Sequence, residues 1–300
     1  MNTSFSSRIT ISLFAFGLSA FFVGCQTIDS TAAAKFATSV TAVKTQANDA
    51  LNAAATLTRD AGITYVATQP TLKEDDFAET PTADIITEWD NTLATIESYA
   101  VNLAALSAPD AAKDFDVAAT NLFNQFTQTA NRLNSKAISS SPAVSAGLAA
   151  GFTQVGHLII EAKAQATARK VATATDPEIG KILTLLANEI GEDHVAPCLR
   201  TTIYRVWGTK KDALNSAFLK APDQASKKAV AQQYANILAE RSAQDQSLLA
   251  LRRSLFALND AHHALAQGNS ASIQSALTII VNEVQRSRNL YSQFSSELKK

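Results

Sequence analysis

The sequence contains few of the residues that interrupt helices or cross-link chains: ten glycines, seven prolines and two cysteines among 300 residues. Long stretches therefore lack a helix breaker, and alanine, the best helix former, is the commonest residue. β-Branched runs such as Thr201-Thr202-Ile203 are too brief to predict a strand. The composition favours an all-α chain built from long helices.

The sequence also lacks an excess of charge of one sign, because 26 basic residues face 27 acidic residues. A nucleic-acid-binding protein would need a clustered basic excess, so we expect no nucleic-acid partner. The chain contains no phosphate-binding glycine loop, nucleophile elbow, zinc-protease helix motif or Rossmann fingerprint. With four histidines, catalysis would have to depend on carboxylates, and we expect a protein that is not an enzyme.

At the N-terminus one cation, Arg8, precedes an apolar stretch over residues 9–23. This stretch is short for a membrane span, which takes about 20 residues, and it has the size of the hydrophobic region of a signal peptide. The segment Phe22-Val23-Gly24-Cys25 resembles the lipobox of bacterial lipoprotein precursors, in which leucine usually stands at the position of Phe22. The resemblance implies that residues 1–24 are a signal peptide and that Cys25 is lipidated. The alternatives are a nonlipidated export signal and an uncleaved anchor.

Lipidation has consequences for the rest of the chain. Cys198 would be the only remaining thiol, which excludes an intramolecular disulfide. Several acyl chains on Cys25 would hold the protein on a bilayer essentially permanently, so the mature chain needs no transmembrane helix, and we expect no further cofactor. Gln26 follows the cysteine where some lipoproteins have aspartate. By resemblance to lipoproteins of two-membraned bacteria, this implies sorting to the outer membrane, facing the periplasm.

Apolar residues recur at alternating steps of three and four almost everywhere after Ser30, which predicts helices that bury one stripe. The pattern is clearest from Ile273 to Leu298 and from Val230 to Leu265, where the spacing is typical of coiled coils. Prolines and capping residues mark the boundaries. The predicted helices cover residues 31–66, 83–106, 109–138, 142–174, 177–219 with a break near Pro197, 222–266 and 270–298.

The lengths of these helices and of their connections predict the architecture. A helix of about 30 residues is about 45 Å long, and short connections make neighbouring helices antiparallel. We therefore predict an elongated up-and-down bundle of six to seven long helices with coiled-coil-like packing. The bundle would occupy residues 25–300, either as one unit or as two parts over 31–174 and 176–300.

Basic and aromatic residues interleave densely in one segment, which is the candidate interaction surface. Such a face could dock on anionic lipid or on an acidic partner. The alternative is a core stripe flanked by cations whose aliphatic stems lie along apolar surface. The residues of the candidate surface are Arg200, Tyr204, Arg205, Trp207, Lys210 and Lys211.

His157 and Glu161 are the first of two candidate metal-binding groups. They stand four residues apart on a predicted helix, so they could share a metal on one face or form a plain helical ion pair. Residues 156–161 distantly resemble the short Gly, His and Glu motif of imelysin-like proteins, which are helical and often exported. In this chain the His directly follows the Gly, and the Glu lies four residues after the His. The family's motif has one residue between the Gly and the His and two residues between the His and the Glu.

His194 and Cys198, with Glu192 and Asp193 beside them, form the second candidate group, because imidazole and thiolate suit zinc or copper. Pro197 interrupts a regular helix between them, and the alternative for Cys198 is a buried small apolar side chain. His262 falls on the predicted helix seam, where we expect a hydrogen-bonded core residue.

These observations lead to one main hypothesis and two alternatives. The main hypothesis is a lipid-anchored envelope protein that acts as a noncatalytic scaffold or adaptor and binds another envelope protein. The first alternative is an imelysin-like or other metal-binding periplasmic protein. The second is a self-assembling structural lipoprotein, a homo-oligomer in which the alanine-rich seam of residues 36–61 and the leucine-rich seam of residues 248–265 pair between chains.

Overall fold

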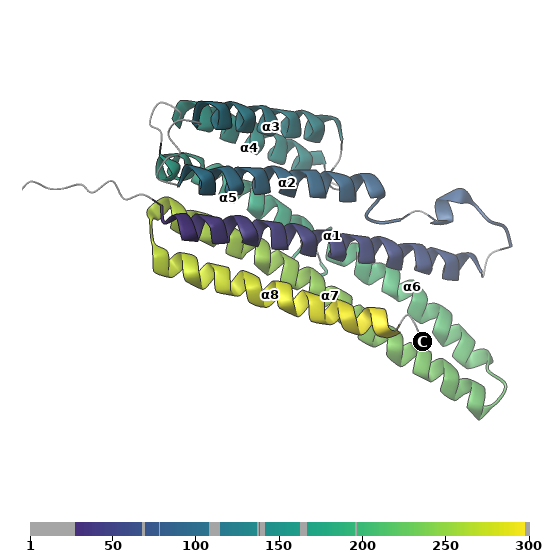
Figure 1. Ribbon diagram of the computed structural model, residues 1–300. Coiled ribbons are helices and arrows are strands. Elements are labelled where there is room, and N and C mark those ends of the chain that lie inside the picture. Colours follow the sequence, from purple (N-terminus) through teal and green to yellow (C-terminus); the bar gives the residue numbers. More distant parts are fainter. Residues whose placement is uncertain are drawn as a thin grey trace, which may run out of the picture.

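The computed structural model describes residues 28–67, 70–77, 79–107, 115–136, 138, 142–162, 167–195 and 197–297 (Figure 1). Within these residues every secondary-structure element is a helix, which confirms the predicted all-α bundle. The predicted signal peptide and Cys25 lie outside them. The elements are α1 (Ser30–Val66), the short 3₁₀ helix η1 (Glu74–Phe77), α2 (Ala83–Leu106), α3 (Phe115–Ser135), α4 (Pro142–Ala162), α5 (Ala168–Ile190), α6 (Leu199–Lys220), α7 (Gln224–Gln267) and α8 (Ser270–Glu297).

The helices lie side by side along one long axis, so the molecule is elongated (Figure 1). Helix α1 contacts α2, α6, α7 and α8, whereas α3 and α4 pack on each other and reach the rest through α2 and α5. One continuous cluster of buried apolar side chains joins the helices, with Phe36, Trp89, Phe126 and Phe152 among its largest members. The part of the chain that is described holds eight α-helices rather than the six to seven predicted, because the expected break near Pro197 separates α5 from α6.

The helix ends follow the local chemistry of the sequence. Asp29 caps α1 by accepting a hydrogen bond from the Thr31 backbone N–H at 2.9 Å. The predicted turn at Gly268 ends α7, and this residue has φ +71°, a left-handed conformation that glycine adopts without a steric penalty. Ser270 then begins α8 two residues later, which makes α7 and α8 an antiparallel pair.

One predicted boundary is wrong. Residues 142–174 were expected to form one helix and Pro177 to begin the next, but α4 ends at Ala162 and α5 continues from Ala168 through Pro177. An interior proline costs about 3 kcal/mol. Burial of the apolar stripe on both sides of Pro177, including Val171 and Ile182, outweighs this cost, because each fully buried aliphatic side chain contributes about 1.5–3 kcal/mol. The division suggested between residues 174 and 176 therefore falls inside a helix that packs on both α4 and α7.

Helix α4 is the one helix among the described residues that is long and apolar enough to cross a membrane by length and composition alone. No transmembrane helix was expected after the signal peptide. Within the bundle 44% of its most apolar stretch is buried, and Leu148, Phe152, Val155 and Ile159 belong to the core. This environment is that of a core helix.

Candidate interaction surface

The end of α6 and the start of α7 diverge from the bundle as a two-helix hairpin, residues 208–243, which we call the arm (Figure 1). No residue of the arm is buried, although every position from 208 to 243 is described. Two helices can bury only the seam between them, so Leu214, Val230 and Ile237 remain half-buried. The arm therefore exposes most of its surface, unlike the rest of the bundle.

Capping explains why the arm turns where it does. Helix α6 ends at Lys220, and Ala221 has an extended backbone that cannot continue the helix. Pro222 follows, and the Asp223 carboxylate accepts a hydrogen bond from the Ser226 backbone N–H at 2.7 Å, which caps α7. The reversal takes only residues 221–223, which holds the two helices antiparallel.

The arm carries exposed apolar side chains at its far end, which we call the tip. Leu219 is 82% exposed and Phe218 is 40% exposed. The Lys227 ammonium lies 5.9 Å from the centroid of the Phe218 ring. The tip comprises Phe218, Leu219, Lys220, Lys227 and Lys228.

A second patch lies where the arm leaves the bundle, and we call it the root patch: the exposed Tyr204, Arg205 and Leu238 with the half-buried Arg241. The Arg241 guanidinium lies 5.1 Å from the centroid of the Tyr204 ring, so the two helices meet here through a cation–π contact. Leu238 precedes Arg241 by one turn of α7 and is also exposed. A hollow of about 340 Å³ opens between α1 and α6, lined by Thr58, Ala61, Gly62, Tyr65, Val206 and Thr209.

The predicted interaction surface is divided by the structure. Tyr204 and Arg205 are exposed, and Lys210 and Lys211 are partly exposed, whereas Arg200 and Trp207 are buried. The six side chains therefore do not share one exposed face. Trp207 belongs to the core stripe that was the alternative interpretation of this segment, whereas Arg200 is buried among polar partners.

Lys210 covers the buried indole of Trp207, with its ammonium 5.1 Å from the ring centroid. Burial lowers the pKa of Lys210, and the carboxylates of Asp60 and Glu240 partly oppose this shift. The Trp207 Nε1 atom is buried without a hydrogen-bond partner among the described residues. Lys210 thus shields the root of the arm and is not a freely solvated cation.

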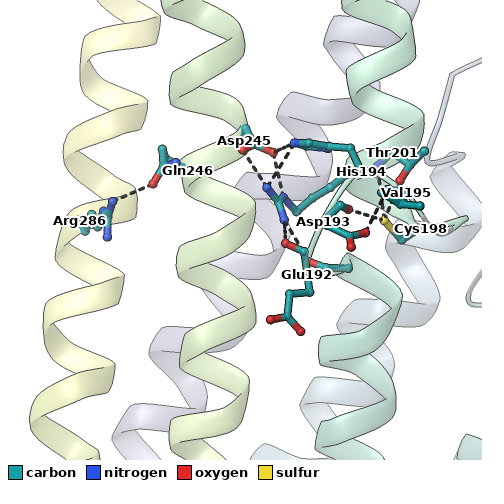
Figure 2. A network of polar contacts seen from close by, with 11 residues as sticks. Glu192, Asp193, His194, Val195, Cys198, Thr201, Asp245, Gln246 and Arg286 are labelled. Atoms are coloured by element: carbon teal, nitrogen blue, oxygen red, sulfur yellow. Dashed lines mark hydrogen bonds and ion pairs between the residues drawn. The ribbon is translucent and has the colours of Figure 1, made fainter.

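Arg200 locks the turn between α5 and α6 to α7, beside the arm. Its Nε and Nη2 atoms donate to the two oxygens of Asp245 at 2.8 and 2.9 Å, a bidentate pair. Its Nη1 atom donates to the backbone carbonyls of Gly191 and Glu192. Figure 2 shows Asp245 of α7 facing the turn that carries His194. Arg200 thus has a carboxylate to balance its buried charge, and the carbonyl groups after the end of α5 have a hydrogen-bond donor.

His194 and Cys198 take part in this structural cluster through different contacts. The His194 ring stacks on Tyr204 with centroids 4.6 Å apart, and its Nε2 atom lies 3.4 Å from Asp245. The Cys198 sulfur accepts from the Thr201 backbone N–H at 3.4 Å and so caps α6. No three His, Cys, Asp or Glu side chains within the described ranges lie close enough together to hold a metal.

His157 and Glu161, the other metal candidates, lie on the exposed side of α4. The His157 ring makes an edge contact with Phe123, with centroids 5.9 Å apart. Neither residue belongs to a group of three metal-binding side chains in the described part of the chain. The pair thus offers at most two ligands, whereas a structural zinc site takes four.

The structure reveals a buried polar chain that the sequence did not indicate. Asp176 accepts from His262 Nδ1 at 3.0 Å and from His263 Nδ1 at 2.6 Å, and His262 Nε2 lies 2.8 Å from the Tyr99 hydroxyl. That hydroxyl also lies 2.7 Å from Thr175. His262 was expected in the core, but the sequence around Asp176, which directly precedes Pro177, does not indicate this partner for it. Its role depends on contacts between α5 and α7, which the sequence pattern does not specify.

This chain of an acid, an imidazole and a hydroxyl has the order of a proton relay, but its imidazole and hydroxyl lie in a closed environment and only the acid is partly exposed. Tyr99 and His262 have no exposed surface and pack against Phe36 and Phe126. Burial raises the pKa of Tyr99 far above its usual value, so the hydroxyl stays protonated at neutral pH. Since Tyr99 and His262 are closed to solvent and only the Asp176 end reaches the surface, the chain acts as a polar layer that fixes how α2, α5 and α7 pack.

Comparison of the sequence and the structure with protein families, curated proteins and solved structures finds no match.

Proposed function

We propose that this chain is a lipid-anchored envelope protein that acts without catalysis, as an adaptor whose root patch binds another envelope protein. The anchor is the lipid on Cys25 implied by the lipobox resemblance, with the mature chain on the periplasmic side of the outer membrane. The observation that carries the proposal is the arm: none of residues 208–243 is buried, yet apolar side chains are exposed at both of its ends.

The chemistry of the root patch indicates the kind of partner. Tyr204 and Leu238 supply apolar surface, and Arg205 and Arg241 supply positive charge beside it. Aromatic and arginine side chains are enriched where proteins bind one another. A partner that fits this patch has an acidic rim around an apolar contact. The adjacent hollow between α1 and α6 extends the surface that the partner can fill.

The position of the patch suits an adaptor. The chain enters the bundle at the end where α7 meets α8, and the arm leaves at the opposite end (Figure 1). Helix α7, with 44 residues, spans about 66 Å between these ends at about 1.5 Å per residue. An anchor at residue 25 therefore leaves the root patch and the arm far from the site of attachment.

Photo-crosslinking in intact cells tests this proposal. A photoreactive amino acid replaces Arg205 or Leu238 in the root patch. As matched controls it replaces Val101 on α2 or Val281 on α8, which are 53% and 63% exposed and lie outside the arm. We expect the same protein to be crosslinked from both root-patch positions and from neither control.

A charge-reversing variant makes the result specific. Arg205→Glu changes the charge of the patch without altering a buried contact, so we expect it to reduce the crosslink from position 238 while the level of the protein stays unchanged. Crosslinks that are equally strong at patch and control positions, or that persist at full strength in Arg205→Glu, would contradict a partner site here.

A further inference from the structure

The tip of the arm combines exposed apolar surface with positive charge on both of its helices. Leu219 is 82% exposed and is followed by Lys220 at the end of α6. Lys227 and Lys228 lie in the first turns of α7, and Lys227 also reaches the Phe218 ring at 5.9 Å. The apolar pair is thus bordered by lysines from both sides of the hairpin.

Charge separates the arm from the rest of the chain. Residues 208–243 contain six basic and three acidic side chains, whereas the whole chain has 26 basic and 27 acidic residues. At the tip itself the one acidic residue, Asp223, accepts the capping hydrogen bond of α7. The arm is therefore positive on a molecule whose remainder is negative, and an anionic surface attracts this end first.

The shape of the tip indicates which kind of anionic surface it fits. Phe218 and Leu219 lie at the end of a projecting hairpin, so they form a convex point (Figure 1). An anionic bilayer can bind a convex tip of this kind in two ways. The boundary between headgroups and acyl chains accepts apolar side chains, and the lipid phosphates attract lysines. A protein partner would need a concave apolar pocket ringed by carboxylates.

We infer that the tip docks on an anionic phospholipid bilayer. Leu219 and Phe218 enter the boundary between headgroups and acyl chains, and Lys220, Lys227 and Lys228 face the lipid phosphates. The inference does not depend on the adaptor function, because it concerns the tip and not the root patch. The docked tip lies at the N-terminal end of α7, a helix of 44 residues and about 66 Å, whereas α1 begins near the other end of α7 (Figure 1).

Vesicle cosedimentation tests this binding with the chain from Gln26 onward, which contains every described helix and lacks the lipid. The vesicles contain equal parts of phosphatidylglycerol and phosphatidylcholine, or phosphatidylcholine alone. We expect binding to the anionic vesicles that weakens as salt rises, because salt screens the lysines. Binding to both kinds of vesicle with equal affinity, or to neither, would overturn the inference.

Tip variants locate the contact. Leu219→Ser should weaken partitioning by about tenfold or more, since one fully buried leucine contributes about that factor. Replacement of the three tip lysines by glutamine should weaken it by about fivefold for each charge. The matched controls are Leu72→Ser, at a position that is 73% exposed outside the arm, and a triple change of Lys35, Lys170 and Lys181 to glutamine.

The controls should bind like the unmodified chain. Equal weakening of vesicle binding in the tip and control variants would show that the chain is attracted to the vesicles without a specific docking site, and it would overturn the inference. In cells, a photoreactive residue at position 219 should crosslink to lipid. A specific protein crosslinked from position 219 would replace the bilayer with a protein partner. Since this readout uses another position, it fails or succeeds separately from the root-patch experiment.

Discussion

The Arg200–Asp245 pair gives a quantitative test of how the turn between α5 and α6, beside the arm, is fixed to α7. Replacement of Asp245 by asparagine keeps the size of the side chain and removes its charge. Arg200 would keep its contacts with the carbonyls of Gly191 and Glu192, but its charge would lose the carboxylate that it meets at 2.8 and 2.9 Å. The side chain of Arg200 is 5% exposed, so solvent cannot replace this partner.

The size of the effect follows from the exposure of the two groups. Removing one member of a fully buried ion pair costs about 3–5 kcal/mol, because it leaves an uncompensated charge. Asp245 is 23% exposed, so solvent already screens part of the interaction. We therefore expect the free energy of unfolding to fall by about 2–3 kcal/mol in Asp245→Asn, a large fraction of a typical total of about 5–15 kcal/mol.

Urea denaturation followed by circular dichroism measures this change in the chain from Gln26 onward. Asp212→Asn is the matched control, because Asp212 is exposed on the arm, and we expect a change within about 0.5 kcal/mol. The double variant Arg200→Met with Asp245→Leu should lose less than the sum of the two single changes, since neither charge then lacks its partner. If Asp245→Asn is no less stable than Asp212→Asn, the pair does not lock this turn to α7.

Two further perturbations test other parts of the fold. Gly191→Ala should destabilise the protein by about 2 kcal/mol or more in the same assay, because a Cβ atom at φ +93° would lie 2.2 Å from the Cys198 sulfur. Gly208→Ala is the control: its Cβ would meet nothing within 4 Å, so it should stabilise α6 by about 0.5–1 kcal/mol. Equal effects of the two substitutions on the free energy of unfolding would contradict the close approach of Gly191 and Cys198. Burial alone raises the pKa of Asp176, but the hydrogen bonds from His262 and His263 and their charges outweigh it and leave the pKa lowered. The ionised carboxylate therefore stabilises the fold above its unfolded pKa of about 4, and this stabilisation is lost as pH falls through the folded pKa. The difference in unfolding free energy between the unmodified chain and Asp176→Asn should be largest near neutral pH and shrink on acidification, and a difference that does not change with pH would refute the assignment.

Periodicity predicted the helices because it reports which faces are buried. The stripe from Phe36 to Ala61 and the stripe from Leu248 to Leu265 both lie in the core. Their burial inside one chain means that pairing of these seams between chains would require the bundle to open. The prediction that a helix begins at Pro177 was wrong, because core packing on either side of this residue outweighs the cost of about 3 kcal/mol for a proline inside a helix.

The candidate interaction surface was predictable only in part. Its six residues are close in sequence, but a helix turns about a third of a revolution at each step, so neighbours point in different directions. Arg200 and Trp207 therefore point inward while Tyr204 and Arg205 point outward. Arg241 and Gln244 of α7, which are three residues apart, are divided in the same way. Gln244 is buried and donates to the Ala50 carbonyl at 3.4 Å, and Arg241 lies over Tyr204.

The buried chain from Asp176 to Tyr99 and the arm depend on long-range contacts. Tyr99, Asp176 and His262 come from three helices and meet only once these helices pack. The exposure of the arm arises because α6 and α7 diverge from α1 and continue past the end of α8 (Figure 1). Sequence patterns give the length of each helix, but they do not say which neighbour ends first.

Metabolic labelling with a palmitate analogue tests the anchored adaptor at its foundation, because the proposed adaptor function assumes attachment at Cys25. Cells that produce the unmodified chain and cells that produce Cys25→Ala are compared at equal protein levels. We predict that the unmodified protein carries the label and fractionates with membranes, whereas Cys25→Ala carries no label. Equal labelling of the two proteins, or an unmodified chain that is unlabelled and soluble, would contradict a lipid anchor and, with it, the adaptor.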